Sequence, residues 1–321
     1  MGSSYPVGHA SGSVRDPDRI LAHAQRLSHD RCMSVPNPEH IATLLVSCPD
    51  RRGLVAALGQ LLYGHGGNIL EADQYSDLSS AQFFQRITFD MSELHTDRVG
   101  LEQAIAEVAQ RFSMRYRLSY RAKRKRVALL VSQYDHCMQE LLWRAQGGDL
   151  DCDIRLVLSN HTKLAPLAQH HGIPFHHLPV TKQSKQEQEA ALRAHIENES
   201  IDLVVLARYM QILSAEFCRD YEERVINIHH SFLPAFVGGR PYHRAHERGV
   251  KIIGATAHYA TADLDEGPII EQDVTRVSHR ETVQDLIRQG RDMERLVLAR
   301  AVRLHLEDRI IVHRNKTVVF S

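Results

Sequence analysis

Four short, nearly continuous apolar runs in the second half of the chain restrict its fold more than any other feature. Such runs, separated by segments in which apolar residues recur at helical spacing, are typical of strands buried on both faces of a parallel sheet. They are VALLV, IRLVLS, LVVLA and VINIH, at residues 127–131, 154–159, 203–207 and 225–229. The sequence therefore predicts an open, mostly parallel α/β domain over residues 127–321.

Two helices of this domain have recognisable ends. Ser214 is a predicted N-cap, because its hydroxyl can accept a hydrogen bond from the first turn. Residues 282–306 form a predicted long helix with an interruption at Gln289 and Gly290.

Residues 37–120 carry a different pattern. An apolar strand from Ile41 leads through the turn PDRRG into leucines at helical spacing, and two strands, a second helix and a closing strand follow. The expected bounds of these later elements are 69–78, 83–89, 101–112 and 114–119. The order βαββαβ is the ferredoxin-like arrangement of one small sheet with two helices on one face.

With its PDRRG and GGN turns, this region resembles the ACT domain, a regulatory module that commonly binds small ligands such as amino acids. The resemblance implies an effector, most simply an amino acid, near Asp50, Gly53 and Asn68. That site would lie within one subunit or across an interface with another. A homo-oligomer, either dimer or tetramer, is also expected.

The basic run RAKRKR at residues 121–126 is predicted to be a solvated linker between the two domains. It contains no aromatic residue, and the chain holds 39 Lys and Arg against 39 Asp and Glu. Without a basic excess there is no field to gather nucleic acid or anionic membrane, so neither is expected as a partner.

Composition places the chain among globular cytoplasmic proteins. It is 43% hydrophobic and 24% charged, and no apolar stretch is long enough to span a bilayer. Its five cysteines are scattered without a CxxC pair, which indicates free thiols in a reducing compartment. Residues 1–36 are predicted to be poorly ordered; their acidic residues disfavour a transit peptide, and Met33 is a plausible alternative start.

The end of the fourth apolar run carries the first candidate chemistry. Asn227 and His229 are two residues apart, so on a strand both project from the same face and can present an amide and an imidazole to one oxyanion. In open α/β sheets ligands bind beyond the carboxyl ends of the strands. Downstream, Asp263 and Asp265 occupy a loop that either returns to the same site or uses its acids only for the turn.

NIHHSFLPAF, together with TAHY and DLDEGPII, is similar to the catalytic segments of the folate-dependent formyltransferase family, which has a Rossmann-like domain. The resemblance implies a catalytic trio of Asn227, His229 and Asp265. ARYMQIL at residues 207–213 is similar to the loop whose backbone holds the pterin ring, although Arg208 and Gln211 depart from the usual residues. The implied folate-binding residues are Leu206, Tyr209, Met210, Gln211, Ile212, Leu213, His258, Asp263 and Leu264.

The segment SQYDHCMQELL at residues 132–142 departs from the transferases of this family that act on a phosphorylated acceptor. It has no glycine, whereas a phosphate cradle at a helix start needs bare backbone amides. Water then becomes the natural acceptor, and the expected reaction is hydrolysis of 10-formyltetrahydrofolate to formate and tetrahydrofolate, which would balance folate pools for purine biosynthesis. Cys137 falls in this segment, but the trio needs no covalent nucleophile.

Three alternatives remain at this point. One is formyl transfer to an amine. Another is a metal hydrolase whose metal ligands would come from the 21 histidines and one acid. No HExxH motif occurs, however, and the family resemblance needs neither a metal nor a cofactor. The candidate ligands are His229, His230, His243, His246 and Asp265. The third is a ligand sensor without turnover, which the intact trio disfavours.

Overall fold

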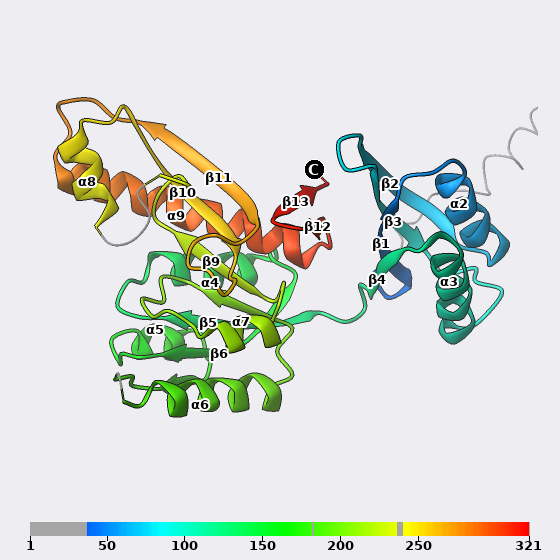
Figure 1. Ribbon diagram of the computed structural model, residues 1–321. Coiled ribbons are helices and arrows are strands. Elements are labelled where there is room, and N and C mark those ends of the chain that lie inside the picture. Colours follow the sequence, from blue (N-terminus) through cyan, green and yellow to red (C-terminus); the bar gives the residue numbers. More distant parts are fainter. Residues whose placement is uncertain (1–36, 182, 236–239, 321) are drawn as a thin grey trace, which may run out of the picture. The chain divides into compact units, whose positions relative to one another are not determined.

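The computed structural model describes residues 37–181, 183–235 and 240–320. The predictions for residues 1–36 and for Cys32 lie outside these residues. After a short 3-10 helix, Pro38–His40, the chain forms a four-stranded antiparallel sheet in the order β2-β3-β1-β4 (Figure 1). Its strands are β1 (Ile41–Pro49), β2 (Asn68–Asp77), β3 (Gln82–Asp90) and β4 (Arg115–Tyr120).

Two helices cover one face of this sheet (Figure 1): α2 (Leu54–Gly64) and α3 (Arg98–Phe112). Their apolar stripes pack with one face of β1 and β3 in a single core. The first helix contributes Leu58 and Leu62, and the second contributes Leu101 and Ile105. The predicted βαββαβ order is thus confirmed.

The second sheet has seven strands in the order β11-β10-β9-β8-β5-β6-β7 (Figure 1). The five strands from β9 to β7 are parallel, while β10 and β11 are antiparallel additions at one edge. The strands are β5 (Lys125–Val131), β6 (Cys152–Ser159), β7 (Phe175–His177), β8 (Leu203–Leu206), β9 (Val225–His229), β10 (Ile252–Tyr259) and β11 (Ile269–Arg276). The predicted mostly parallel α/β architecture is confirmed.

Helices cover both faces of this sheet, as the apolar runs require. Along β5, Leu129 contributes to the core shared with α4 and α9, whereas Leu130 contributes to the core shared with α6 and α7. The helices are α4 (His136–Gly147), α5 (Ala165–His170), α6 (Lys185–Asn198), α7 (Ala215–Asp220), α8 (Pro241–Arg248) and α9 (Val283–Leu306). Ser214 caps α7 as predicted, by accepting a hydrogen bond from the Phe217 amide.

Helix α9 is continuous, so the interruption expected at Gln289 and Gly290 is wrong. The glycine has a packing role instead of a helix-breaking one. A Cβ atom at Gly290 would lie 2.0 Å from the hydroxyl oxygen of Tyr242, so only glycine leaves room for the tyrosine of α8.

The linker prediction is wrong for the end of the basic run, because Lys125 and Arg126 already belong to β5. The Lys125 ammonium donates to the carbonyl oxygens of His305 and Leu306, at 2.9 and 3.0 Å, and pairs with Asp308 at 2.8 Å. These carbonyls end α9 and have no partner within the helix, so a cation there is favourable. Burial lowers the pKa of Lys125 in spite of that partner.

From Glu39 onward the chain forms one compact unit, and β3 contacts its C-terminal segment. Nε of the buried Arg86 donates to the carbonyl of Asp308 at 3.0 Å and a terminal nitrogen donates to the carbonyl of Glu307 at 3.3 Å. Phe84 of β3 packs with Phe320, next to the hairpin of β12 (Ile310–His313) and β13 (Lys316–Val319).

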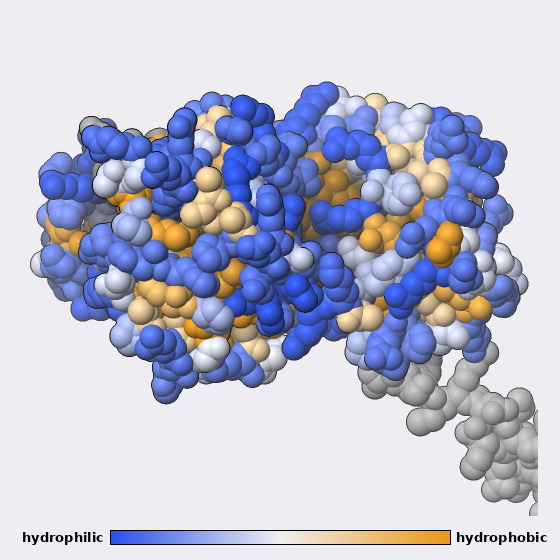
Figure 2. All heavy atoms as spheres, turned by 90° about the horizontal axis from the view of Figure 1, so that it is seen from below, coloured by the Kyte–Doolittle hydropathy of each residue, from blue (hydrophilic) through white to orange (hydrophobic). Residues whose placement is uncertain are grey.

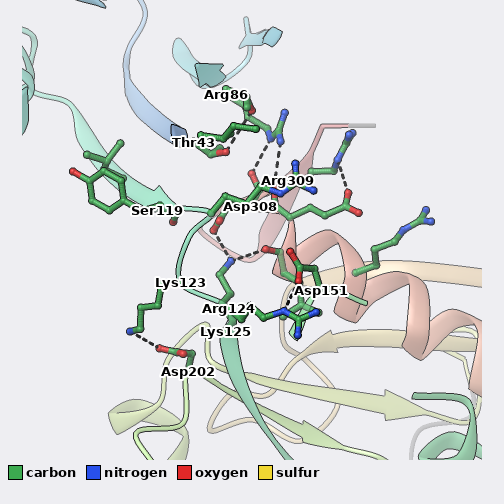
Figure 3. A pocket seen from close by; sticks show the side chains of 18 of the residues that line it. Thr43, Arg86, Ser119, Lys123, Arg124, Lys125, Asp151, Asp202, Asp308 and Arg309 are labelled. Carbon is green, nitrogen blue, oxygen red and sulfur yellow. Dashed lines mark hydrogen bonds and ion pairs between the residues drawn. The ribbon is translucent and has the colours of Figure 1, made fainter. Parts of the chain in front are cut away.

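A polar cavity of about 570 Å³ lies beside these contacts (Figure 3). Its carboxylates pair with cations that line the same cavity, including Asp151 with Arg124 and Asp202 with Lys123. The pairing neutralises much of the charge that the sequence concentrates at residues 121–126.

No helix of the described residues is both long and apolar enough to cross a membrane. The face drawn in Figure 2 is mostly hydrophilic, with apolar side chains in small groups.

Candidate active site

The two side chains predicted to face one oxyanion, Asn227 and His229, lie at the C-terminal end of β9 and line the same pocket. β9 pairs in parallel with β8 and in antiparallel with β10. That register places Asn227 opposite His258. The structure therefore brings three predicted site residues together from two neighbouring strands.

His258 orients the amide of Asn227. Its Nδ1 lies 2.9 Å from the carbonyl oxygen of Tyr259, an atom that only accepts, so Nδ1 carries the proton. Its Nε2 is then the acceptor for the Asn227 Nδ2 amide, 3.2 Å away. Burial lowers the pKa of His258, which keeps this tautomer neutral. One N–H of Asn227 is fixed, and the other is left for a ligand.

His229 is held by Asp265, whose Oδ1 also lies 3.8 Å from Nε2 of His258. Nδ1 of the imidazole lies 3.2 Å from Oδ1 of the carboxylate. Burial raises the pKa of Asp265, but the hydrogen bond and charge of His229 outweigh it, so the pKa is lowered overall and the acid is ionised. Nε2 of His229 is buried without a hydrogen-bond partner. A buried nitrogen of this kind needs a partner, and here it faces a pocket.

The loop that carries Asp265 returns to the sheet, in agreement with the first of the two interpretations of this acidic segment. Asp265 has a left-handed backbone, with φ 59°, and its side chain is 7% exposed, whereas Asp263 is exposed. Gly267 brings the loop against β10, since a Cβ there would lie 1.8 Å from the carbonyl oxygen of Tyr259.

All nine residues proposed to bind folate line the pocket that contains the trio. Its volume is about 260 Å³, slightly below the range of ~300–1,000 Å³ typical of ligand sites, so it suits one ring system better than an entire folate. Met210, Ile212 and Leu264 are about half exposed at this site, at 50%, 59% and 49%. Their assignment to folate stays a prediction.

The segment from residue 208 to 213 is fixed at its start. Ser132, directly after β5, accepts the backbone N–H of Met210 at 3.0 Å. Gln188 of α6 donates to the hydroxyl of Tyr209 at 2.6 Å. These two contacts hold the loop after β8 across the carboxyl edge of the sheet.

Comparisons with known proteins agree with this geometry. Residues 125–302, more than half of the chain, match the family described as Formyl transferase, and residues 42–112 match the ACT domain. A protein named formyltetrahydrofolate deformylase from Synechocystis sp. is 55% identical over 280 residues, which cover 87% of this chain and 98% of the relative. One of the same name from Bacillus subtilis is 50% identical over 279 residues, covering 87% and 93%. The chain belongs to the formyltetrahydrofolate deformylase family.

Solved structures separate the deformylases from their transferase relatives. A crystal structure of a formyltetrahydrofolate deformylase from Pseudomonas syringae, 46% identical, covers 94% of this chain and all of its own, with a TM-score of 0.86. Glycinamide ribonucleotide transformylase 1 from Symbiobacterium toebii, 29% identical, covers 62% of this chain and 95% of its own, with a TM-score of 0.58. The deformylase match thus extends over both domains, and both resemblances stated from the sequence are confirmed.

A buried polar cluster next to the pocket was not predicted from the sequence. Glu294 of α9 is 1% exposed and accepts hydrogen bonds from Tyr242, at 2.7 Å, and from His136, at 2.8 Å. Arg208 pairs with the same carboxylate at 3.3 Å and donates to Nδ1 of His230. A carboxylate between the buried Met293 and Val297 of a helix was the available signal.

His136, Cys137 and Glu294 are close enough together to hold a metal ion. The Glu294 carboxylate, however, already forms an ion pair with Arg208, and the positive charge of that guanidinium disfavours a second cation at the same place. Burial raises the pKa of the Cys137 thiol well above its usual value, so it is neither a ready ligand nor a nucleophile. Two other metal candidates, His243 and His246, are exposed on α8.

The three residues proposed for the effector are not brought together within one chain. Asp50 and Gly53 lie in the turn between β1 and α2, and Gly53 has φ 91°. Asn68 pairs with Asp90, which in turn pairs with Ile41 at the other end of β1. Eight residues of strand separate the two ends by ~26 Å, so one amino acid can contact all three only if a second subunit contributes.

Proposed function

We propose that this chain hydrolyses 10-formyltetrahydrofolate to formate and tetrahydrofolate, as the names of its relatives indicate for them. The observation that carries the proposal is the buried, unpartnered Nε2 of His229, which lines one pocket with Asn227 and Asp265. These groups are suited to stabilising a developing oxyanion and to moving a proton.

In the first step, water attacks the formyl carbon and the carbonyl π electrons move to oxygen. The free N–H of Asn227 and Nε2 of His229, in its protonated form, donate to that oxyanion. Asp265, ionised in the free protein, accepts the proton that the attacking water loses. One oxyanion donor contributes a factor of ~10²–10³ and acid–base help ~10²–10⁴, which together suffice for a regulated hydrolase.

In the second step, the oxyanion re-forms a carbonyl and the bond from carbon to N10 breaks. N10 takes up the proton held by Asp265, so tetrahydrofolate leaves with its amine restored. The formic acid releases its own proton to solvent at neutral pH, which balances the reaction.

Water as acceptor is supported by the segment after β5. Where a phosphate cradle would need glycines, this chain begins α4 at His136, whose side chain donates to Glu294. The glycines that such a cradle needs are thus replaced by residues with side chains, one of which, His136, is already bonded to Glu294. Formyl transfer to an amine is the competing outcome of the test below.

The proposal extends to the setting of the reaction. Free, buried thiols at Cys48, Cys137, Cys152 and Cys218 support a reducing compartment, and we place the reaction in the cytoplasm. The ACT domain supports an amino-acid effector, and the separation of Asn68 from Asp50 supports a homo-oligomer. Release of tetrahydrofolate would adjust the folate pool for purine biosynthesis, with no metal or cofactor required.

The deciding experiment follows formate and tetrahydrofolate from purified protein and 10-formyltetrahydrofolate, without any amine. We expect equal amounts of the two products. Glycinamide ribonucleotide is then added, and its formylation is followed by mass spectrometry. A formylated nucleotide, or turnover that depends on an added amine, would overturn hydrolysis in favour of transfer.

A further inference from the structure

Among the residues that the structure describes, Glu294 is the most deeply buried ionised group that the proposed mechanism leaves unused. It contacts three segments that are distant in sequence: it accepts hydrogen bonds from His136 of α4 and Tyr242 of α8, and it forms an ion pair with Arg208 in the loop after β8. Burial alone would raise the pKa of Glu294, but the charge of Arg208 and the hydrogen bond from His136 lower it to about 2. A charge that is fully buried and fully paired needs every one of its partners.

Arg208 connects this carboxylate to the active site. Its guanidinium, 10% exposed, pairs with Glu294 and donates to Nδ1 of His230. Arginine has no acceptor, so Nδ1 of His230 must be unprotonated and the ring proton must reside on Nε2. Arg208 holds this geometry from a left-handed backbone position, with φ 63°, which a β-branched residue would not adopt readily.

His230 adjoins the catalytic imidazole. The ring centroids of His229 and His230 are 5.2 Å apart, and both residues line the substrate pocket. A charged imidazolium at His230 would place a cation next to the ring of His229 and compete with that ring for Asp265. Burial, followed by the charge of Arg208, lowers the pKa of His230 to about 3, so the bonded ring is neutral.

We propose that Glu294 is a positioning residue for formyl hydrolysis: by holding Arg208, it fixes the ring of His230 beside His229 with Nδ1 as an acceptor. The inference rests on the proposed hydrolysis. Unmodified protein that releases no formate would refute that function, whereas the variants below test Glu294 only against active unmodified protein.

Glu294→Gln keeps the shape and removes the charge that holds Arg208. We expect kcat to fall by ~10- to 100-fold, the range for misplacing a reacting group by about 1 Å, with KM within about threefold of the unmodified value. Glu140→Gln is the matched control, because Glu140 of α4 also pairs with α9, through Arg295 at 3.7 Å, in addition to Arg144 of its own helix at 2.7 Å. The control should keep its kcat.

Arg208→Gln tests the same connection without removing a buried carboxylate. Its single effect on kcat should match that of Glu294→Gln, and the double variant should be no slower than the slower single one, because both break one connection. This variant also keeps the proposal testable if Glu294→Gln does not fold.

The pH profile separates positioning from mere stability. The charged or titratable groups facing His230 are Arg208, Glu294, His229, Asp265 and, with rings 6.1 Å apart, Tyr242. Burial, the larger cause of the lowered pKa of His230, remains in Arg208→Gln, but the second cause, the charge of Arg208, is removed, so the pKa rises part of the way towards its ordinary value. The rate of Arg208→Gln should then fall on acidification at a higher pH than that of unmodified protein, and ¹⁵N spectra should show protonation of Nδ1 there.

Three results would overturn the proposal: a kcat within about threefold of normal in Glu294→Gln, additive effects in the double variant, or an unmoved acid limb in Arg208→Gln. A lower Tm with unchanged kcat would assign Glu294 a role in stability alone.

Discussion

Oδ1 of Asp265 lies 3.2 Å from Nδ1 of His229, while Asp263, two residues earlier in the same loop, is exposed. Of the two acids, Asp265 therefore contacts the imidazole proposed to be catalytic. The left-handed backbone at Asp265 turns its side chain inward. This pairing predicts that Asp265, and not Asp263, accepts the proton of the attacking water.

Asp265→Asn should lower single-turnover formate release by at least ~100-fold, the lower end for positioned acid–base catalysis, because the amide cannot accept the proton of water. Folate binding should be largely retained. Asp263→Asn is the matched control and should lose little. Near-normal release from Asp265→Asn with collapse in Asp263→Asn would mean that the other acid is the base.

Removal of metal ions should leave the rate unchanged. The one described group with metal-ligand spacing contains Glu294, whose oxygens are already bonded to Tyr242 and His136 and paired with Arg208. The measurement is formate release before and after dialysis against a chelator. Activity lost on dialysis and restored only by zinc or iron would contradict the mechanism.

Gly290→Ala should destabilise the protein by about 1–3 kcal/mol, the typical effect of overpacking, because the new methyl group would meet the ring of Tyr242. Gly59→Ala is the control: Gly59 lies inside α2 with open space around it, and alanine there should stabilise by about 0.5–1 kcal/mol. Urea unfolding followed by circular dichroism measures both. Equal effects at the two sites would argue against the packing role of Gly290.

An amino-acid effector should bind only to an oligomer, since one chain separates Asn68 from Asp50. Isothermal titration against a panel of amino acids, with activity measured in parallel, identifies the ligand. Asp50→Asn and Asn68→Ala should each weaken its binding by about tenfold, as expected for loss of one charged or polar contact. Glu107→Gln, on the exposed side of α3, should not. Flat titrations throughout would restrict the domain to assembly.

Local patterns predicted most of the fold and the centre of the site. Asn227 and His229 are two residues apart on one strand, so their common face follows from strand geometry alone. Asp265 was found by the family resemblance of its segment. In each case the residues that led to the prediction are close together in the sequence, so their spacing or their order in a motif was enough to identify them.

The remaining features depend on contacts between distant residues. Arg208 and Glu294 are 86 positions apart, and neither has a local pattern that names the other. Lys125 looked like part of a solvated run because its partners, the carbonyls at the end of α9, lie 180 residues later. Within one chain, Asn68 lies at the opposite end of the sheet from Asp50 and Gly53. The strand register determines which turns lie at the same end of the sheet, and the sequence of the turns does not show that register.

Helix α9 connects the four-stranded sheet of the ACT domain to the buried Glu294 in the second domain. Its middle bears Glu294, and its last carbonyls are held by Lys125 of β5, with Arg86 of β3 bound to the two residues that follow. Twelve residues of helix span about 18 Å. The sheet of the ACT domain and the Glu294 carboxylate are thus connected through one helix, so a displacement of β3 would act on the helix whose Glu294 pairs with Arg208.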